Sequence, residues 1–406
     1  MITVERLDLR GDGVAGDLRV ARALPGEVVA GEAADGRIAA PRILHPAPER
    51  VRAPCPHYRA CGGCALMHAS DGFVAGWKAE VVTRALAGQG LSAPMRAMHV
   101  SPPGARRRAV LAGRRLKRGA LVGFHARASD TVTAIPDCRL LHPDLIAALP
   151  VFEALTEAGA ARGRALALTA CVSEAGVDLA VSGGKALDGP LRARLAQIAG
   201  QGGLARLAWE GEVLAQAAPP VQRMGAAAVV PPPGAFLQAT AQGAAALVAA
   251  VLEAPDGAAR VADLFAGCGT FALPLAESAA VHAVEADAAM LAALDAGARG
   301  TPGLRAVTTE ARDLFRRPLL ADELSRFDAV VIDPPRAGAR AQIAEMARAA
   351  VPVIGAVSCN PVTFARDARV LTEAGYSLDW VQGVDQFRWS AHVELAARFT
   401  RGHIAR

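Results

Sequence analysis

The chain has 406 residues, a formal net charge of +5 and an isoelectric point near 9.0. This length is enough for two or three domains with large cores, and the charge is compatible with a polyanionic partner. No apolar run approaches the length of a membrane span, and acidic residues interrupt the N-terminus, so we expect a cytoplasmic protein without a signal peptide. An odd number of cysteines, seven, indicates metal binding or catalysis over disulfides.

Short alternating runs predict β-strands at residues 3–9, 18–24 and 27–30, which glycines or a proline separate. Strands of this length are typical of a small barrel. Such a module can be purely structural or can bind a ligand, and the strands alone do not distinguish the two. Prolines between residues 46 and 54 mark its exit.

Three cysteines follow, Cys55, Cys61 and Cys64, with five and then two residues between them. This spacing places three thiolates around one point, and the two glycines before Cys64 let the backbone approach an inorganic centre closely. Cys138, in a turn-like stretch, is the predicted fourth ligand. Four thiolates can hold zinc or an iron–sulfur cluster, and spacing does not decide between them.

Residues 71–87 predict a helix that ends at glycines, with Phe73, Trp77, Val81 and Leu86 on one face. The most basic stretch of the chain comes next. Seven arginines and lysines lie within residues 106–118, and no acidic residue occurs from 101 to 128. Because the basic residues alternate with β-like runs, we predict a basic sheet face that contacts RNA phosphates; a solvated face is the alternative.

The middle of the chain is less informative. Residues 166–172 and 177–181 predict a hairpin, and residues 191–198 predict a helix. Three prolines at 231–233 indicate a linker, and an alanine-rich helix is expected at 242–254.

The last part of the chain predicts alternating strands and helices. A strand at 260–265 leads into a turn containing Gly267 and Gly269, where backbone amides can approach a nucleotide-like ligand at a helix N-terminus. The next strand, 282–284, ends at Glu285, whose carboxylate can accept hydrogen bonds from ribose hydroxyls. The same glycine spacing also fits a dinucleotide fingerprint.

Three further strands end in polar residues. A strand at 304–308 precedes Asp313, one at 327–332 precedes Asp333, and one at 351–357 precedes Cys359. In an open α/β sheet the ligand crevice lies at the carboxyl ends of the strands. A lone cysteine is more often a small core residue than a nucleophile, but this position favours the nucleophile.

Four motifs, DLFAGCGTF (263–271), DPPRAGA (333–339), SCNPVTFARD (358–367) and HVE (392–394), resemble those of the S-adenosylmethionine-dependent RNA 5-methyluridine methyltransferases. The resemblance is closest to the branch acting on 23S ribosomal RNA. It implies an α/β fold with three parts: a TRAM-like, oligonucleotide-binding-type β-barrel (1–48), a central α+β iron–sulfur and RNA-binding domain (49–235), whose helix near 71–88 can pack on the catalytic domain, and a Rossmann-like class I methyltransferase domain (236–406).

The resemblance also implies roles for individual residues. Cys359 is the expected nucleophile and Glu394 the expected base, and the four cysteines are expected to hold a [4Fe–4S] cluster. Thr240 and Thr270 stand where relatives commonly carry asparagine, and residues 388–390 lack the usual proline after phenylalanine. The positions expected to contact S-adenosylmethionine or the substrate are Gln238, Phe265, Gly267, Gly269, Thr270, Glu285, Asp313 and Asp333.

The implied reaction explains these residue types. Uracil C5 is a weak nucleophile until a thiolate adds at C6, and a base must then remove the C5 proton before the thiol leaves. We therefore expect methyl transfer to C5 of a flipped or unpaired uridine, in 23S ribosomal RNA or alternatively in tRNA, by a monomer that needs no protein partner. An NAD-dependent oxidoreductase and a non-catalytic iron–sulfur RNA-binding protein are the alternatives from other classes.

Overall fold

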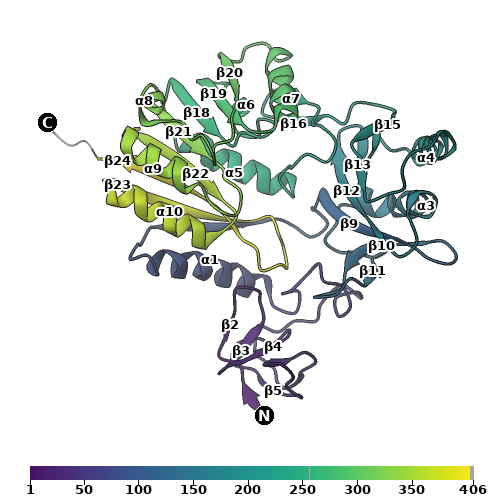
Figure 1. The fold of residues 1–406 in the computed structure, drawn as a ribbon. Coiled ribbons are helices and arrows are strands. Elements are labelled where there is room, and N and C mark those ends of the chain that lie inside the picture. The colour runs from purple at the N-terminus through teal and green to yellow at the C-terminus, as the bar shows by residue number, and fades with distance from the viewer. Residues whose placement is uncertain (256, 403–406) are drawn as a thin grey trace.

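The computed structural model describes residues 1–255 and 257–402, and its strands group into successive sheets along the chain (Figure 1). Two small N-terminal sheets are followed by a seven-stranded sheet and then by an eight-stranded sheet. A short hairpin of β16 (Gln222–Met224) and β17 (Ala227–Val229) lies between the two large sheets in sequence.

The N-terminal residues form one three-stranded and one four-stranded sheet. The first contains β1 (Ile2–Thr3), β5 (Val28–Ala30) and β7 (Arg42–His45); the second contains β2 (Arg6–Leu7), β3 (Gly13–Ala15), β4 (Leu18–Val20) and β6 (Arg37–Ile38). The predicted β character is confirmed, but β3 lies in the glycine-rich stretch that we took as a separator. A Cβ on Gly13 would lie 2.8 Å from Val4 and 3.0 Å from the Ala23 carbonyl, so close packing requires glycine there.

The seven-stranded sheet is antiparallel except between β13 and β14, and it packs on α3 and α4. The predicted hairpin and the helix near 191–198 are confirmed. Fully buried Phe152 and Trp209 fill the space between the sheet and the helices. Its elements are β9 (Arg108–Arg115), β10 (Ala120–His125), β11 (Val132–Ala134), α2 (Pro143–Ala147), α3 (Leu149–Gly159), β12 (Ala165–Ser173), β13 (Gly176–Ser182), α4 (Gly189–Gln201), β14 (Arg206–Trp209) and β15 (Glu212–Gln216).

The eight-stranded sheet has the order β20-β19-β18-β21-β22-β24-β23-β8. The first five of these strands are parallel, and β24 runs antiparallel to both of its neighbours. Its strands are β8 (Met95–Val100), β18 (Arg260–Leu264), β19 (Ala280–Glu285), β20 (Val307–Ala311), β21 (Ala329–Ile332), β22 (Val353–Ser358), β23 (Tyr376–Asp385) and β24 (Glu394–Arg401).

Helices cover both faces of this sheet, as in a doubly wound α/β fold. One face packs on α5 (Ala241–Glu253), α6 (Ala272–Leu275) and α7 (Ala288–Arg299). The other packs on α1 (Asp71–Ala87), α8 (Ala321–Leu324), α9 (Arg340–Ala349) and α10 (Pro361–Glu373).

Helix α1 has the predicted bounds, and it packs against α10 and β8 (Figure 1). The predicted apolar face was only partly right: Trp77 and Leu86 are buried, but Phe73 and Val81 are half-buried, and fully buried Lys78 takes a place on the inner side. Strand β8 extends the eight-stranded sheet by pairing with β23. Residues 71–100, within the range predicted for the central domain, therefore contribute to the last sheet.

Three predicted element bounds near the C-terminus were wrong. The strand expected at 304–308 begins three residues later, as β20. Strand β23 was not predicted, because its alternation of polar and apolar residues is interrupted by a register shift between Leu378 and Trp380. Gln386, which we placed at the start of the final strand, lies in the loop between β23 and β24.

Candidate active site

Strand register brings four predicted residues to one edge of the eight-stranded sheet. Leu264 of β18 pairs with Ile332 of β21, and Ile332 pairs with Ala356 of β22. Phe265, Asp333 and Cys359 therefore leave neighbouring strands at their carboxyl ends. Because β24 is antiparallel and Leu395 pairs with Ser358, its first residue lies at the same edge. That first residue is Glu394.

Cys359 lies between the end of β22 and the start of α10. The side chain of Asn360 caps the helix by accepting a hydrogen bond from the Val362 N–H at 3.1 Å, and Pro361 occupies the first helical position. The Asn360 side chain also donates to the Arg336 carbonyl at 2.9 Å. This bond fixes the cysteine loop to the turn that follows Asp333.

A cavity of about 580 Å³ opens at Cys359. Arg336, Asn360 and His392 line it from the catalytic sheet, whereas Trp77 and Arg84 line it from α1. Residues of the N-terminal sheets complete the wall, among them three arginines: Arg6, Arg10 and Arg19. Segments more than 300 residues apart in sequence therefore enclose one cavity whose wall is strongly basic.

Three acidic groups affect one another at this edge. Burial, followed by the charges of Glu394 and Asp333, raises the pKa of the Cys359 thiol to about 11, and Arg336 opposes that rise. Burial raises the pKa of Asp333 to about 7. Burial and then the charge of Asp333 raise the pKa of Glu394 well above its usual range. Glu394 is 3% exposed, and its Oε2 has no hydrogen-bond partner among the described residues.

The glycine turn after β18 forms as predicted. Gly267 and Gly269 both have positive φ, +55° and +95°. The Gly267 N–H donates to the Glu285 carboxylate at 3.1 Å, which joins the first turn to the end of the second strand. Thr270 is half-buried just before α6.

Phe265 is a non-glycine residue in the left-handed region, with φ of 63°. Such backbone conformations are costly and occur often at functional sites. The ring of Phe265 lies 5.4 Å from the ring of Phe315, which is 50% exposed. Phe315 follows Asp313, whose carboxylate accepts from the Phe315 N–H at 2.9 Å. Sequence reasoning did not find Phe315, because its signal is only an aromatic residue two positions after Asp313.

Asp263 is a second residue that sequence reasoning missed. It lies on β18, is fully buried, and neither carboxylate oxygen has a hydrogen bond of normal geometry among the described residues. Burial, and then the charge of nearby Asp333, raise its pKa well above the usual range. The available signal was its place as the first residue of the DLFAGCGTF motif, where an acid interrupts a buried apolar strand.

Gln238 lies apart from the cysteine cavity. It is buried, and the side chain of Gln386 donates to its side-chain oxygen. Gln238 and Thr270 line a larger cavity, of about 820 Å³, between α5 and the seven-stranded sheet. Thr240 caps α5 by accepting from the Gly243 N–H at 2.9 Å, so its hydroxyl is engaged in the helix start.

The chain resembles known proteins over nearly its whole length. It is 44% identical to an uncharacterized RNA methyltransferase of Brucella suis biovar 1 (strain 1330), over 99% of this chain and 98% of the relative. It is 35% identical to the 23S rRNA (uracil(1939)-C(5))-methyltransferase of Pseudomonas entomophila, over 89% of this chain and 82% of that protein. The family model for tRNA (uracil-5-)-methyltransferase matches residues 303–401.

The chain belongs to the RNA uracil-5-methyltransferase family. It is therefore an RNA (uracil-5-)-methyltransferase, which sets aside the oxidoreductase and the non-catalytic alternatives. Its fold is similar to that of Pyrococcus abyssi tRNA (uracil-54, C5)-methyltransferase in complex with S-adenosyl-L-homocysteine, with a TM-score of 0.76, 21% identity and coverage of 98% of both chains. This likeness confirms the predicted α/β methyltransferase fold.

The methyltransferase brings its four predicted cluster cysteines together. Cys55, Cys61, Cys64 and Cys138 line one small cavity of about 20 Å³. The Gly63 N–H donates to the Cys61 sulfur at 3.3 Å. Within residues 1–255 and 257–402, no group of three or more cysteines, histidines or acids is arranged to hold a single metal ion.

The basic stretch of the methyltransferase divides into two parts, which corrects the prediction of one basic face. Arg107 and Arg108 are half-buried and donate to the carbonyls of Gln238 and Ala235 at 3.3 and 3.1 Å. Lys117 and Arg118 are exposed at the turn between β9 and β10 and have no ion pair among the described residues. Only this second part is free to contact a large ligand.

A search of the described residues finds no helix that is both long and apolar enough to cross a membrane.

Proposed function

We propose that the methyltransferase transfers a methyl group from S-adenosylmethionine to C5 of a uridine in 23S ribosomal RNA, through a covalent bond between Cys359 and uracil C6. The observation that carries this proposal is the strand register, which brings Cys359, Asp333 and Glu394 to one edge of one sheet. A nucleophile and two acids at that edge match the needs of the reaction.

The acidic groups near the glycine turn support the cofactor assignment. Asp263, Asp333 and Glu394 are buried with raised pKa values, so a negative charge on any of them is unfavourable without a positive partner. S-adenosylmethionine carries positive charge on its sulfonium and its amino group, and it supplies the methyl group in electrophilic form. We place it against Phe265, Gly267, Gly269, Thr270, Glu285, Asp313, Asp333 and Gln238.

Cys359 begins the reaction by adding to C6 of uracil as a thiolate. Its thiol proton must leave first, because only the thiolate is an effective nucleophile. Since the thiol pKa is raised to about 11, the fraction of thiolate near neutrality is small, and Arg336 is the group that opposes this rise. Addition makes C5 electron-rich, and C5 then accepts the methyl group.

Glu394 acts after the methyl group has been accepted. Its carboxylate removes the C5 proton, and the electrons of that C–H bond form the C5–C6 double bond as the Cys359 thiolate leaves C6. The raised pKa of Glu394 gives its carboxylate a high proton affinity, which suits proton removal from carbon. Asp333 can orient the ring by accepting a hydrogen bond from uracil N3–H.

The basic wall of the Cys359 cavity supports an RNA substrate. Arg6, Arg10 and Arg19 extend from the N-terminal sheets, and guanidinium groups bind phosphate oxygens well. We interpret residues 1–48 as a TRAM-like barrel of the oligonucleotide-binding type, residues 49–235 as the iron–sulfur and RNA-binding domain, and 236–406 as the methyltransferase domain. Lys117 and Arg118 are the exposed part of the central domain's basic stretch.

We propose that Cys55, Cys61, Cys64 and Cys138 hold a [4Fe–4S] cluster that supports the RNA-binding domain. The donor set fits, and the Gly63 N–H bonded to Cys61 is of the kind that stabilises cluster sulfurs. A Cβ on Gly62 would lie 2.6 Å from the His125 carbonyl, so this loop is packed as closely as glycine permits. A cluster is larger than the cavity of about 20 Å³, and the cysteine loop would have to open to receive it.

The choice of 23S ribosomal RNA follows the 35% identity to the Pseudomonas enzyme, and a tRNA uridine is the alternative suggested by the matching family model. Nucleoside mass spectrometry of RNA fractions from a deletion strain tests the choice. We expect 5-methyluridine to be lost from 23S ribosomal RNA and to return with the wild-type gene. Loss confined to the tRNA fraction would replace the rRNA proposal with the tRNA alternative.

A further inference from the structure

The loop between β20 and α8, residues 312–320, carries Asp313 and Phe315 toward the glycine turn. Phe315 is half exposed and contacts the ring of Phe265. Within the loop, the Asp313 carboxylate accepts from the Phe315 N–H at 2.9 Å, and the Asp313 carbonyl accepts from the Arg317 N–H at 2.8 Å. An exposed loop of this kind keeps one shape only when groups outside it restrain its backbone.

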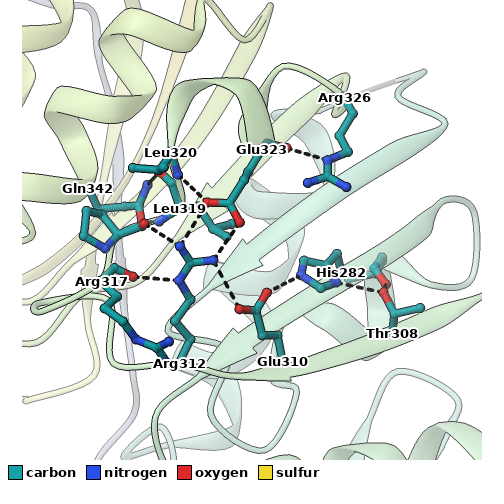
Figure 2. Close-up of polar contacts among 12 residues, drawn as sticks. His282, Thr308, Glu310, Arg312, Arg317, Leu319, Leu320, Glu323, Arg326 and Gln342 are labelled. Carbon is teal, nitrogen blue, oxygen red and sulfur yellow. Dashed lines mark hydrogen bonds and ion pairs between the residues drawn. The ribbon is translucent and has the colours of Figure 1, made fainter.

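The guanidinium group of Arg312 supplies that restraint (Figure 2). It donates to the carbonyls of Arg317 and Pro318, both at 2.8 Å. It also forms a two-point ion pair with the Glu323 carboxylate, at 2.8 and 2.9 Å, and contacts Glu310 at 3.2 Å. These contacts use all five N–H donors of an arginine. The side chain is 12% exposed.

A second set of contacts fixes the partners of Arg312. The Glu323 carboxylate also accepts from the Leu320 N–H at 2.8 Å. Glu310 contacts the ring nitrogen Nε2 of His282 at 3.2 Å, and the other ring nitrogen contacts the Thr308 hydroxyl at 2.9 Å. The carboxylates that receive Arg312 are thus restrained from both sides, as Figure 2 shows.

Helix α9 holds the far end of the same loop. Gln342 is fully buried, and its side chain accepts from the Leu319 N–H at 2.8 Å and donates to the Leu319 carbonyl at 3.1 Å. The backbone of Arg312 adds a link at the near end, because its N–H donates to the Glu285 carbonyl at 2.9 Å. The network therefore connects the loop with the strand end that carries Glu285.

We propose that Arg312 is a positioning residue for the cofactor, which acts by holding Asp313 and Phe315 in the shape that receives S-adenosylmethionine. This inference rests on the proposed cofactor site. Arg312 itself touches neither cofactor nor RNA. Lysine cannot replace it, because a single ammonium group cannot reach two carbonyls and both oxygens of Glu323 together.

Arg312→Lys tests the proposal, with Arg326→Lys as the matched control. Arg326 is an exposed arginine that donates to the Glu323 carbonyl at 2.9 Å but contacts neither Asp313 nor the loop carbonyls. Titration calorimetry with S-adenosylhomocysteine should give a Kd raised about tenfold for Arg312→Lys and unchanged for Arg326→Lys. With saturating S-adenosylmethionine, kcat and the KM for RNA should stay within about twofold of wild type.

A folded Arg312→Lys variant with wild-type affinity for S-adenosylhomocysteine would overturn the proposal, and so would a loss of kcat without a change in Kd. If Arg312→Lys does not fold, Glu323→Gln carries the same test, since it keeps the shape of the two-point contact and removes its charge. Failure of the wild-type protein itself to bind S-adenosylhomocysteine would refute the proposed cofactor, and is thereby distinguished from failure of the Arg312 role alone.

Discussion

The edge of the eight-stranded sheet and the basic stretch of residues 106–118 both gather functional side chains, but backbone geometry fixes only the first. At the sheet edge, hydrogen-bonded register determines that Cys359 and Glu394 leave adjacent strands side by side. In the basic stretch, long side chains leave one segment in different directions. Arg107 and Arg108 turn inward to backbone carbonyls, whereas Lys117 and Arg118 remain exposed. Position is thus predictable at strand ends, and direction is not predictable for long side chains.

The largest expected effect lies at the sheet edge. Cys359→Ala removes the thiolate and should abolish methylation, because no other group near the cavity can add to uracil C6. Binding of S-adenosylhomocysteine and RNA should persist, since the residue contributes one small side chain to the wall of a cavity of about 580 Å³. A methyl-transfer assay beside a binding titration measures both. Retained methylation in this variant would remove Cys359 from the mechanism.

The pH dependence gives the next largest effect. The pKa of Asp333 is raised to about 7, so its carboxylate becomes neutral below that pH and stops accepting from uracil N3–H. The thiol of Cys359, with its pKa raised to about 11, gains thiolate as the pH increases. Single-turnover rates should therefore rise between pH 6 and 9, by up to about tenfold per unit where one group limits the rate. A rate that falls over this range would contradict both assignments.

The cysteine loop provides a comparison with the sheet edge, because its four thiols come from two separate segments of the sequence. Protein purified without oxygen should be brown and contain iron and sulfide, and Cys138→Ser should lose the colour and unfold at a lower temperature. Cys171→Ser is the matched control, since that cysteine is buried in the core away from the loop. One zinc per chain with no iron or sulfide would refute the cluster.

The smallest expected effect is in the basic stretch. Neutralising Lys117 and Arg118 together should raise the KM for RNA a few-fold and reduce the salt slope of binding by roughly one unit or slightly less for each phosphate that is no longer neutralised. Neutralising Arg108 should instead lower stability, because its guanidinium donates to the Ala235 carbonyl. Equal salt slopes for wild type and the double variant would make the exposed part of the stretch a solvated face.

Most of the catalytic sheet was predictable from the sequence, because apolar runs that end in polar residues mark buried parallel strands and their ligand edge. Strand β23 and the recruitment of β8 were not, since their pairing joins segments more than 250 residues apart. Sequence reasoning also missed Asp263 and Arg312. The roles of these residues depend on burial and on hydrogen bonds that form only in the folded chain.

The mechanism depends on the order of the covalent steps, and Glu394→Gln separates those steps from one another. The glutamine cannot remove the C5 proton, so the chain should still add to uracil and accept the methyl group but release product about 10²- to 10⁴-fold more slowly. A protein–RNA adduct that survives denaturing electrophoresis and carries label from the methyl group of S-adenosylmethionine is the predicted result. A folded Glu394→Gln variant with neither adduct nor loss of rate would contradict the mechanism.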